Sequence, residues 1–400
     1  MRTVFTLAAL HGWYMTGVDV CTAYLFGKLD EEIYMRQPKG FIARGQESKV
    51  IRLCRALYGL KQAGLAWWKE LSQSMKALGF KCLYSDAGIF VYREGPNLVL
   101  AVVYVDDAIF IGRNENLVIK KKALFMAKWE CQDLGDFKEF LQMCITWQGS
   151  KIKIDQTEYL KKVLERFSMV NAKSAATPLP SNWDPKANTG TATAAKVTNY
   201  QSIIGSLLYL MIGTRPDIAY AVTHLSQFCT NPSPEHYKVA LHICRYLVGT
   251  QDYLLVYSNT GDKGLEAYLD SNWAADKIQR RSVTGNFFKL AGGIICWRSY
   301  AQKTTALSST EAEYMALSNC SKQAVWIKTL IEELGFHLTA VPIYGDNQGA
   351  IFIASNAMQE SCTKHIDIQY HYIRELINAK QVEFVGYIYM SLAHLFTHYP

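Results

Sequence analysis

The sequence feature that most constrains the fold is a pair of adjacent aspartates between two apolar, β-branched runs. The runs cover residues 98–105 and 108–111, and Asp106 and Asp107 lie between them. Short apolar runs that are separated by turn residues predict a β-hairpin, with the two acids at its turn. Placing carboxylates between buried strands costs free energy unless a cation or strong hydrogen-bond donors compensate. These residues alone leave two interpretations open: an ordinary solvated turn, or a site for paired Mg²⁺ ions.

A further acid interrupts an apolar run upstream. Asp19 lies within residues 17–25, at the expected end of a strand. Together the two stretches resemble the palm of a reverse transcriptase, whose hallmark tetrapeptide reads Tyr104-Val105-Asp106-Asp107 here. Other runs narrow the resemblance to copia-type retrotransposon Pol polyproteins, and they cover residues 31–41, 57–63 and 308–314. The resemblance extends over the whole chain.

The resemblance implies that the chain copies RNA into DNA. The residues that it implies for holding paired Mg²⁺ ions, or Mn²⁺ in their place, are Asp19, Asp106 and Asp107. It also implies that Tyr24 is a steric gate behind the sugar of the incoming nucleotide, that Lys61 faces its phosphates and that Tyr104 lies in the same substrate pocket. The implied partners are an RNA template, a DNA primer and deoxynucleoside triphosphates.

The last 150 residues have a different order of expected elements: strands, a long helix, a strand, a helix and a final strand–helix pair. This is the order of a ribonuclease H domain. Asp270 and Asp346 each end an expected strand, and Glu311 lies in the first turn of the long helix. Three such acids could converge on one metal pair.

Each of these acids also has a structural interpretation. Ser308-x-x-Glu311 is a capping box, Asp346-Asn347 could cap the next helix, and Asp270-Ser271-Asn272 could form a turn. The resemblance favours the metal interpretation, and it implies cleavage of the RNA strand of an RNA–DNA hybrid.

The sequence departs from the family pattern at several positions. His394 stands where copia-type sequences carry the aspartate that completes the ribonuclease site, and a neutral imidazole suits Mg²⁺ less well than a carboxylate does. Gly64 and Leu65 replace a Pro-Arg pair, and Gln142 replaces a glycine that usually marks a close backbone approach. The fingers region that normally comes first is absent. We therefore expect a truncated, partly degenerate copy with impaired activities and primer extension near zero.

The expected architecture is a multidomain α+β and α/β fold. Residues 1–170 are predicted to form a palm and thumb, residues 171–250 a linker and connection segment, and residues 251–400 a ribonuclease H-like domain. In the connection segment, Arg215 and Asp217 are expected to form a local salt bridge at a helix start. The net charge of +7 is uneven: it is +6, +3 and −2 in the three regions. A basic first region fits a partner with a phosphate backbone.

Composition limits the cellular setting and the alternatives. The ten cysteines contain no Cys-x-x-Cys pair, which indicates reduced thiols in an intracellular protein of the cytoplasm or nucleus. No apolar run reaches the length of a membrane span, so no membrane partner is expected. One alternative function is a catalytically inactive nucleic-acid-binding remnant of the same element. Another, an integrase-like enzyme that acts on DNA ends, leaves the Asp-Asp tetrapeptide unexplained. The sequence does not predict an oligomeric state.

Overall fold

The chain forms two compact units in the computed structural model. The described residues are 1–181, 183–259, 264–276, 280–355 and 367–386. One unit comprises Met1 and His11–Phe137, and the other comprises Arg2–Leu10 and Lys138–Pro400. Residues 138–170, which were predicted to belong to the palm and thumb, thus lie in the second unit. The three-domain division by function stays a prediction.

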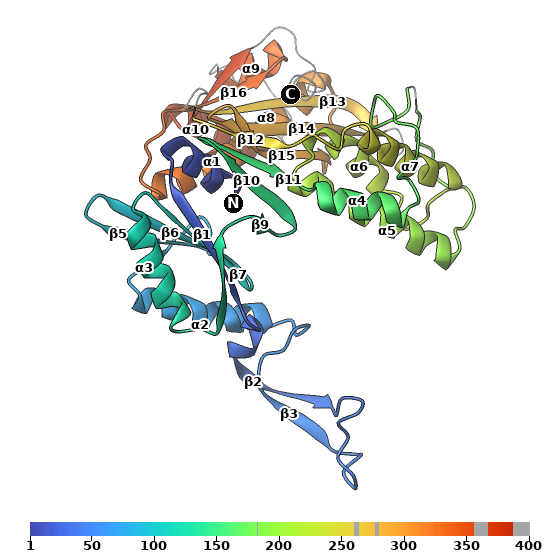
Figure 1. Ribbon diagram of the computed structural model, residues 1–400. Coiled ribbons are helices and arrows are strands. Elements are labelled where there is room, and N and C mark those ends of the chain that lie inside the picture. Colours follow the sequence, from blue (N-terminus) through green and yellow to red (C-terminus); the bar gives the residue numbers. More distant parts are fainter. Residues whose placement is uncertain (182, 260–263, 277–279, 356–366, 387–400) are drawn as a thin grey trace. The chain divides into compact units, whose positions relative to one another are not determined.

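A six-stranded antiparallel sheet forms the centre of the first unit (Figure 1). Its strands, in sheet order, are β4 (Lys81–Cys82), β5 (Ile89–Glu94), β6 (Asn97–Tyr104), β7 (Asp107–Gly112), β1 (Tyr14–Val20) and β8 (Cys131–Asp136). Two helices, α2 (Ala63–Ala77) and α3 (Glu115–Met126), pack against one face. The shared core includes Trp67 and Met75 of α2 and Phe110 of β7. This packing fixes the strand ends that carry the predicted palm acids.

The predicted hairpin at the two aspartates is confirmed. β6 and β7 pair in antiparallel register, and Tyr104 lies opposite Asp107. Only Val105 and Asp106 remain between the paired residues. The turn is therefore a two-residue hairpin turn.

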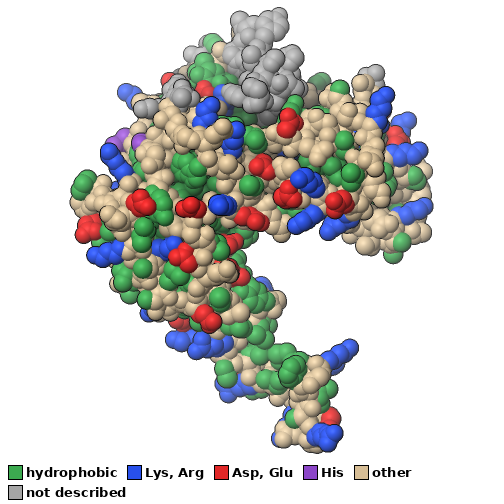
Figure 2. All heavy atoms as spheres, in the orientation of Figure 1, with side chains coloured by type: hydrophobic (Ala, Val, Ile, Leu, Met, Phe, Trp, Pro, Cys, Tyr) green, Lys and Arg blue, Asp and Glu red, His purple; other side chains and the backbone are tan. Residues whose placement is uncertain are grey.

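A two-stranded arm extends from the same unit. It consists of β2 (Lys28–Arg36) and β3 (Val50–Arg55), and it follows the short helix η1 (Ala23–Phe26). Phe41 and Ile42 at its tip are exposed. Figure 2 shows apolar side chains together with Lys and Arg side chains toward the end of this arm. The arm contributes little to the core of its unit.

The second unit contains a small sheet and a helical layer. The sheet strands, in sheet order, are β12 (Leu255–Tyr257), β11 (Lys151–Asp155), β10 (Met143–Gln148) and β9 (Glu139–Phe140). The other elements are α1 (Arg2–His11), α4 (Thr157–Arg166), α5 (Ala194–Gly213), η2 (Pro216–Ile218), α6 (Ala219–Ser226) and α7 (Pro234–Val248). The helices expected near residues 155–167, 200–212 and 236–248 are all present. One of them, α5, begins six residues early, at the Thr193 cap.

A five-stranded sheet completes the second unit. Its strands, in sheet order, are β15 (Gly293–Ala301), β14 (Arg281–Leu290), β13 (Leu265–Asp276), β16 (Val341–Gly345) and β17 (Val382–Gly386). The first three form an antiparallel meander, and β16 and β17 run parallel to β13. The helices are α8 (Ser309–Glu333), α9 (Gln348–Ser355) and α10 (Asp367–Asn378). The long helix packs on β13, so one end of α8 lies beside the acid of that strand.

The element order agrees with the expected one up to β17, with α10 as an additional helix. The residues of the expected final helix lie outside the described part of the chain. Among the described residues, no helix has the length and apolar character that a bilayer crossing requires.

Candidate functional site

The three predicted palm acids come from two neighbouring strands and the turn between β6 and β7. Asp19 of β1 lies directly opposite Asp107 of β7 in the antiparallel register. Asp106 occupies the turn, and its carbonyl accepts a hydrogen bond of 2.7 Å from the Val20 amide. Directly opposed residues project from the same face of a sheet. The structure therefore places Asp19 beside Asp107 on the sheet, but the carboxylates of Asp19, Asp106 and Asp107 do not meet within 4.8 Å of one another as a set of three.

The turn that presents Asp106 has a constrained backbone. Val105 has a φ of 56°, in the left-handed region that β-branched residues rarely adopt. Two-residue hairpin turns need such an angle to follow the strand twist. The indole nitrogen of Trp67 donates a 2.9 Å hydrogen bond to the Val105 carbonyl. Helix α2 thus stabilises the turn through this hydrogen bond.

The carboxylate of Asp106 has an unfavourable environment for its charge. Burial raises its pKa above the usual range, and the neighbouring charge of Asp19 raises it further. A hydrogen bond from the Tyr58 hydroxyl opposes these effects and lowers the pKa. The hydroxyl lies 3.0 Å and 2.9 Å from the two carboxylate oxygens. A divalent cation would compensate the same repulsion.

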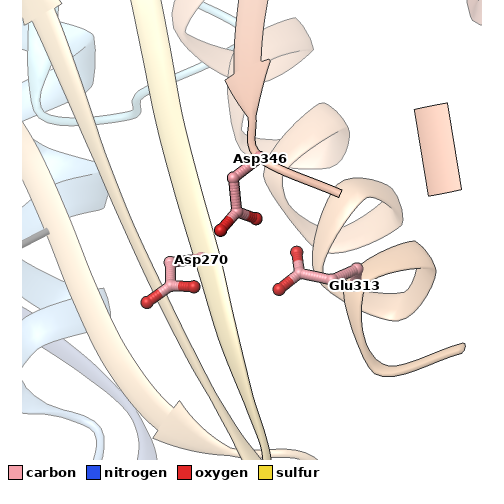
Figure 3. Close-up of side chains that lie close together, drawn as sticks. All are labelled: Asp270, Glu313 and Asp346. Carbon is pink, nitrogen blue, oxygen red and sulfur yellow. The ribbon is translucent and has the colours of Figure 1, made fainter. Parts of the chain in front are cut away.

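A second group of acids lies on the five-stranded sheet. Figure 3 shows Asp270 of β13, Glu313 of α8 and Asp346 at the end of β16 with their carboxylates toward one another. One ligand atom from each lies within 4.8 Å of the other two. Among the described residues this is the one set of three potential metal ligands that meet so closely.

The structure corrects one member of the expected set, because Glu313 takes the place that we assigned to Glu311. Successive residues of an α-helix are about 100° apart, so residues two positions apart point to nearly opposite sides. Glu311 reaches back and accepts a 2.7 Å hydrogen bond from the Leu307 amide. Ser308 caps the helix by accepting from the Glu311 amide at 3.1 Å. The contacts of Glu311 therefore agree with the capping interpretation.

The structure also changes the setting of Asp270. This residue was expected to end a strand or to lie in a turn, but it lies inside β13 and pairs with Gly285. The strand continues because Ser271 and Asn272 pair with the next residues of β14. Asp346 follows β16 as expected. In the Asp346-Asn347 pair, Asn347 is the residue that caps α9, because its side chain accepts from the Ala350 amide at 2.9 Å.

The second acid group fits a divalent cation. Glu313 is only 5% exposed, and its carboxylate accepts a 2.8 Å hydrogen bond from the Ser271 amide. Burial, together with the charges of Asp270 and Asp346, raises its pKa to about 8 against the lowering effect of that hydrogen bond. Burial and Asp346 also raise the pKa of Asp270. An all-oxygen donor set with this unmet charge suits Mg²⁺.

Comparisons with known proteins address the family. A family model described as reverse transcriptase (RNA-dependent DNA polymerase) matches residues 1–181. The retrovirus-related Pol polyprotein from transposon TNT 1-94 of Nicotiana tabacum is 38% identical over 397 residues, which is 96% of this chain and 29% of that protein. The putative transposon Ty5-1 protein of Saccharomyces cerevisiae is 31% identical over 303 residues, which is 75% of this chain and 98% of that protein. The chain belongs to the copia-type Pol polyprotein family of reverse transcriptases.

This copia-type chain spans only part of its longer relatives. It covers 29% of the tobacco polyprotein and 26% of the Pol polyprotein from transposon RE1 of Arabidopsis thaliana, to which it is 37% identical. A solved foamy viral protease–reverse transcriptase in complex with double-stranded DNA has a TM-score of 0.47 and 13% identity, over 96% of this chain and 71% of that one.

The predicted substrate residues of the copia-type palm lie in η1, at the end of β6 and in the turn that precedes α2. Tyr24 is in η1, and its ring centre lies 4.6 Å from that of Tyr58. Tyr104 ends β6 and is 56% exposed. Lys61 is exposed in the turn that precedes α2. Their roles toward a nucleotide stay predictions.

Two departures from the family pattern have different outcomes. Leu141 and Gln142 form the two-residue turn between β9 and β10, with φ values of 49° and 55°. A glycine at position 142 would adopt this left-handed conformation without strain. The turn therefore accounts for the family's glycine without a close backbone approach. His394 lies outside the described residues.

Sequence reasoning missed two residues of these sites, Glu313 and Tyr58. The capping box was a usable signal for Glu313, because it assigns Glu311 to the helix start and leaves Glu313 as the free acid. No comparable local signal existed for Tyr58, whose partner is 48 residues away.

Proposed function

We propose that this chain carries the reverse transcriptase and ribonuclease H portion of a copia-type Pol polyprotein. In this proposal the palm acids serve RNA-directed DNA synthesis, and the acids of the five-stranded sheet serve cleavage of the RNA strand of an RNA–DNA hybrid. The observation that carries the ribonuclease assignment is the convergence of three carboxylates from β13, α8 and β16. A strand order with a central β13 supports it.

In the ribonuclease site, Asp270, Glu313 and Asp346 would hold the divalent ions. Such ions, when bound, activate water and stabilise the charge that develops on the scissile phosphate. The chain contributes orientation, because the Ser271 amide fixes the buried Glu313 carboxylate. Asp346 is exposed and leaves the site open to a backbone phosphate. Hybrids are recognised through backbone and 2′-hydroxyl contacts more than through sequence.

The test is Mg²⁺-dependent cleavage of a labelled RNA–DNA hybrid by two matched variants. Glu313→Gln should lower the rate by about a hundredfold or more, since it removes a metal ligand rather than an outer partner. Glu311→Gln, two residues away on the same helix, should keep the parental rate, because glutamine can still accept from Leu307. The reverse pattern would overturn the assignment. Mn²⁺ titration of the parent and Glu313→Gln adds a readout that does not depend on turnover.

In the polymerase site, Asp19, Asp106 and Asp107 would hold the ions that assist attack of the primer 3′-hydroxyl on the nucleotide. Tyr24 would exclude a ribose 2′-hydroxyl, and Lys61 would meet the phosphates. Primer extension on poly(rA) with Mg²⁺ tests this role. Extension that Asp106→Asn abolishes would support it and would overturn the near-zero extension expected from the sequence, whereas extension that survives Asp106→Asn would exclude these acids.

A second candidate function is nucleic-acid binding without catalysis. The basic balance of residues 1–170 favours it, and so does the replacement of the family's Pro-Arg pair by Gly64 and Leu65. Hybrid binding that weakens with salt, together with no Mg²⁺-dependent extension or cleavage, would support this alternative. Binding that does not respond to salt would exclude it.

A further inference from the structure

The Tyr58 hydroxyl contacts Asp106, the palm acid that lies in the hairpin turn. It lies between β3 and α2, and its side chain is half exposed. Its hydroxyl lies 2.9 Å and 3.0 Å from the two carboxylate oxygens of Asp106, so one donor is shared by both. Charge-assisted hydrogen bonds of this kind are among the stronger ones in proteins. The contact thus covers both oxygens that Asp106 could offer to a cation.

The position of Tyr58 is fixed from two further directions. Its ring centre lies 4.6 Å from that of Tyr24, with an interplanar angle of 42°. The next residue, Gly59, has a φ of 96°, which a residue with a Cβ would adopt only with strain. A hydrogen bond of 3.2 Å from the Leu60 amide to the Leu57 carbonyl closes the turn. The loop therefore holds the Tyr58 hydroxyl in contact with the Asp106 carboxylate.

A cation that approaches Asp106 between its two carboxylate oxygens meets the Tyr58 hydroxyl, which is shared by both oxygens, so the two compete for the lone pairs on that side. Mg²⁺ binds carboxylate oxygens at roughly 2.0–2.1 Å, well inside the distance of the hydroxyl. The Tyr58 hydroxyl cannot keep both of its contacts when a cation binds there. The same hydroxyl offsets the repulsion between Asp19 and Asp106 when no cation is bound.

We propose that Tyr58 is a positioning residue that holds the Asp106 carboxylate in the ion-free palm and is displaced by the incoming divalent cation. This inference rests on the proposed role of the palm acids as metal ligands. Tyr58 then couples cation binding to the aromatic pair that it forms with Tyr24. The coupling links the metal site to the predicted sugar pocket through one side chain.

Mn²⁺ titration followed by electron paramagnetic resonance tests the competition. The background carries Asp270→Asn and Glu313→Gln, so that the second acid group does not contribute. Tyr58→Phe keeps the ring but removes the hydroxyl, and it should tighten Mn²⁺ binding roughly fivefold, which corresponds to one lost competing hydrogen bond. Tyr84→Phe is the matched control, because that side chain is 96% exposed, and it should leave the affinity unchanged.

The outcomes separate this inference from the proposed function. If Asp106→Asn does not weaken Mn²⁺ binding, the palm metal role fails. If Asp106→Asn weakens it while Tyr58→Phe leaves the affinity unchanged or lowers it, only the competition fails.

A measurement on the chain without the background substitutions gives an independent readout. With 3-fluorotyrosine at position 58, the ¹⁹F signal should shift on addition of Mg²⁺, and the shift should be lost in Asp106→Asn. A signal that does not respond to Mg²⁺ while Asp106 still binds the metal would overturn the displacement.

Discussion

Two glutamates on the first turns of α8 differ in environment, and the difference predicts a pH effect. Burial raises the pKa of Glu313 to about 8, from an ordinary value near 4.5 in the unfolded chain. Between these two values the folded chain binds more protons than the unfolded chain, so stability falls as pH rises through this window. Without divalent ions, the free energy of unfolding should drop by roughly 2–4 kcal/mol between pH 5 and pH 8 from this group alone.

Urea unfolding of the parent and Glu313→Gln in EDTA, at both pH values, isolates this contribution. The substitution should remove most of the decline, and Glu311→Gln should retain it. Added Mg²⁺ should restore stability to the parent at pH 8, because a cation favours the ionised cluster. If the free energy of unfolding had the same pH dependence in the parent and in Glu313→Gln, the raised pKa of Glu313 would not be the cause of the decline.

The turn between β9 and β10 predicts a stabilising substitution. Leu141 and Gln142 both have positive φ values, as in a type I′ turn, whose second position favours glycine. Relief of the left-handed strain, less the entropy cost of glycine, should make Gln142→Gly more stable by up to about 1 kcal/mol. Thermal unfolding measures the change.

The matched control for this substitution is Gln148→Gly at the other end of strand β10. Gln148 lies in β10 and pairs with Lys151, so a glycine there should destabilise by about 0.5–1 kcal/mol. If both glycines had the same sign of effect, the left-handed strain would not be the cause.

At the scale of the elements, local signals predicted much of the fold. Ser308 is the N-cap that predicts the start of α8, and Gly335, with a φ of 93°, follows its end. The hairpin at Asp106 follows from apolar periodicity alone. Such signals do not predict how a helix is rotated about its axis or which distant residues meet. The face of α8 that packs on β13 determines that Glu313 meets Asp270, and the folding of a distant loop brings Tyr58 to Asp106. Both are set by tertiary packing, which local periodicity does not specify.

Arg215 forms a local ion pair with Asp217 at the start of η2, and it also contacts Thr250 just after α7. The predicted local salt bridge is confirmed at 2.6 Å, with side-chain exposures of 3% and 10%. Arg215 also donates to the Thr250 carbonyl at 2.9 Å, a contact that the sequence did not indicate. Removing one partner leaves a buried charge, so Asp217→Asn should lower the free energy of unfolding by about 3 kcal/mol.

An exposed pair provides the comparison for this effect. Glu158 and Lys161 of α4 form a 2.8 Å ion pair with exposures of 76% and 53%. Glu158→Gln should leave the free energy of unfolding nearly unchanged, because solvent screens an exposed pair. Chemical denaturation of both variants measures the contrast, and a cost for Asp217→Asn as small as that for Glu158→Gln would mean that the pair is solvated.

At the scale of the whole molecule, charge is distributed unevenly along the chain. Residues 1–170 carry a net +6 and residues 251–400 a net −2. The β2–β3 arm and its tip contain seven Lys or Arg and four Asp or Glu residues. Phosphate contacts release counterions, so binding of a hybrid should weaken linearly in log–log salt titrations. The double substitution of Lys39 and Lys49 by Gln should lower the salt slope by up to about 2 if both contact phosphate.

The control removes the same charge from the same unit. Lys76 and Lys81 are exposed near the end of α2 and in β4, away from the arm, and their double substitution by Gln should change the slope less. Fluorescence anisotropy with a labelled hybrid at several salt concentrations gives both slopes. Equal reductions would mean that only net charge matters, whereas a larger effect from the arm would assign it as the phosphate-contacting element. The proposed function assigns cleavage to the separate acid cluster, so the cleavage rate at saturating hybrid should stay the same in both double variants.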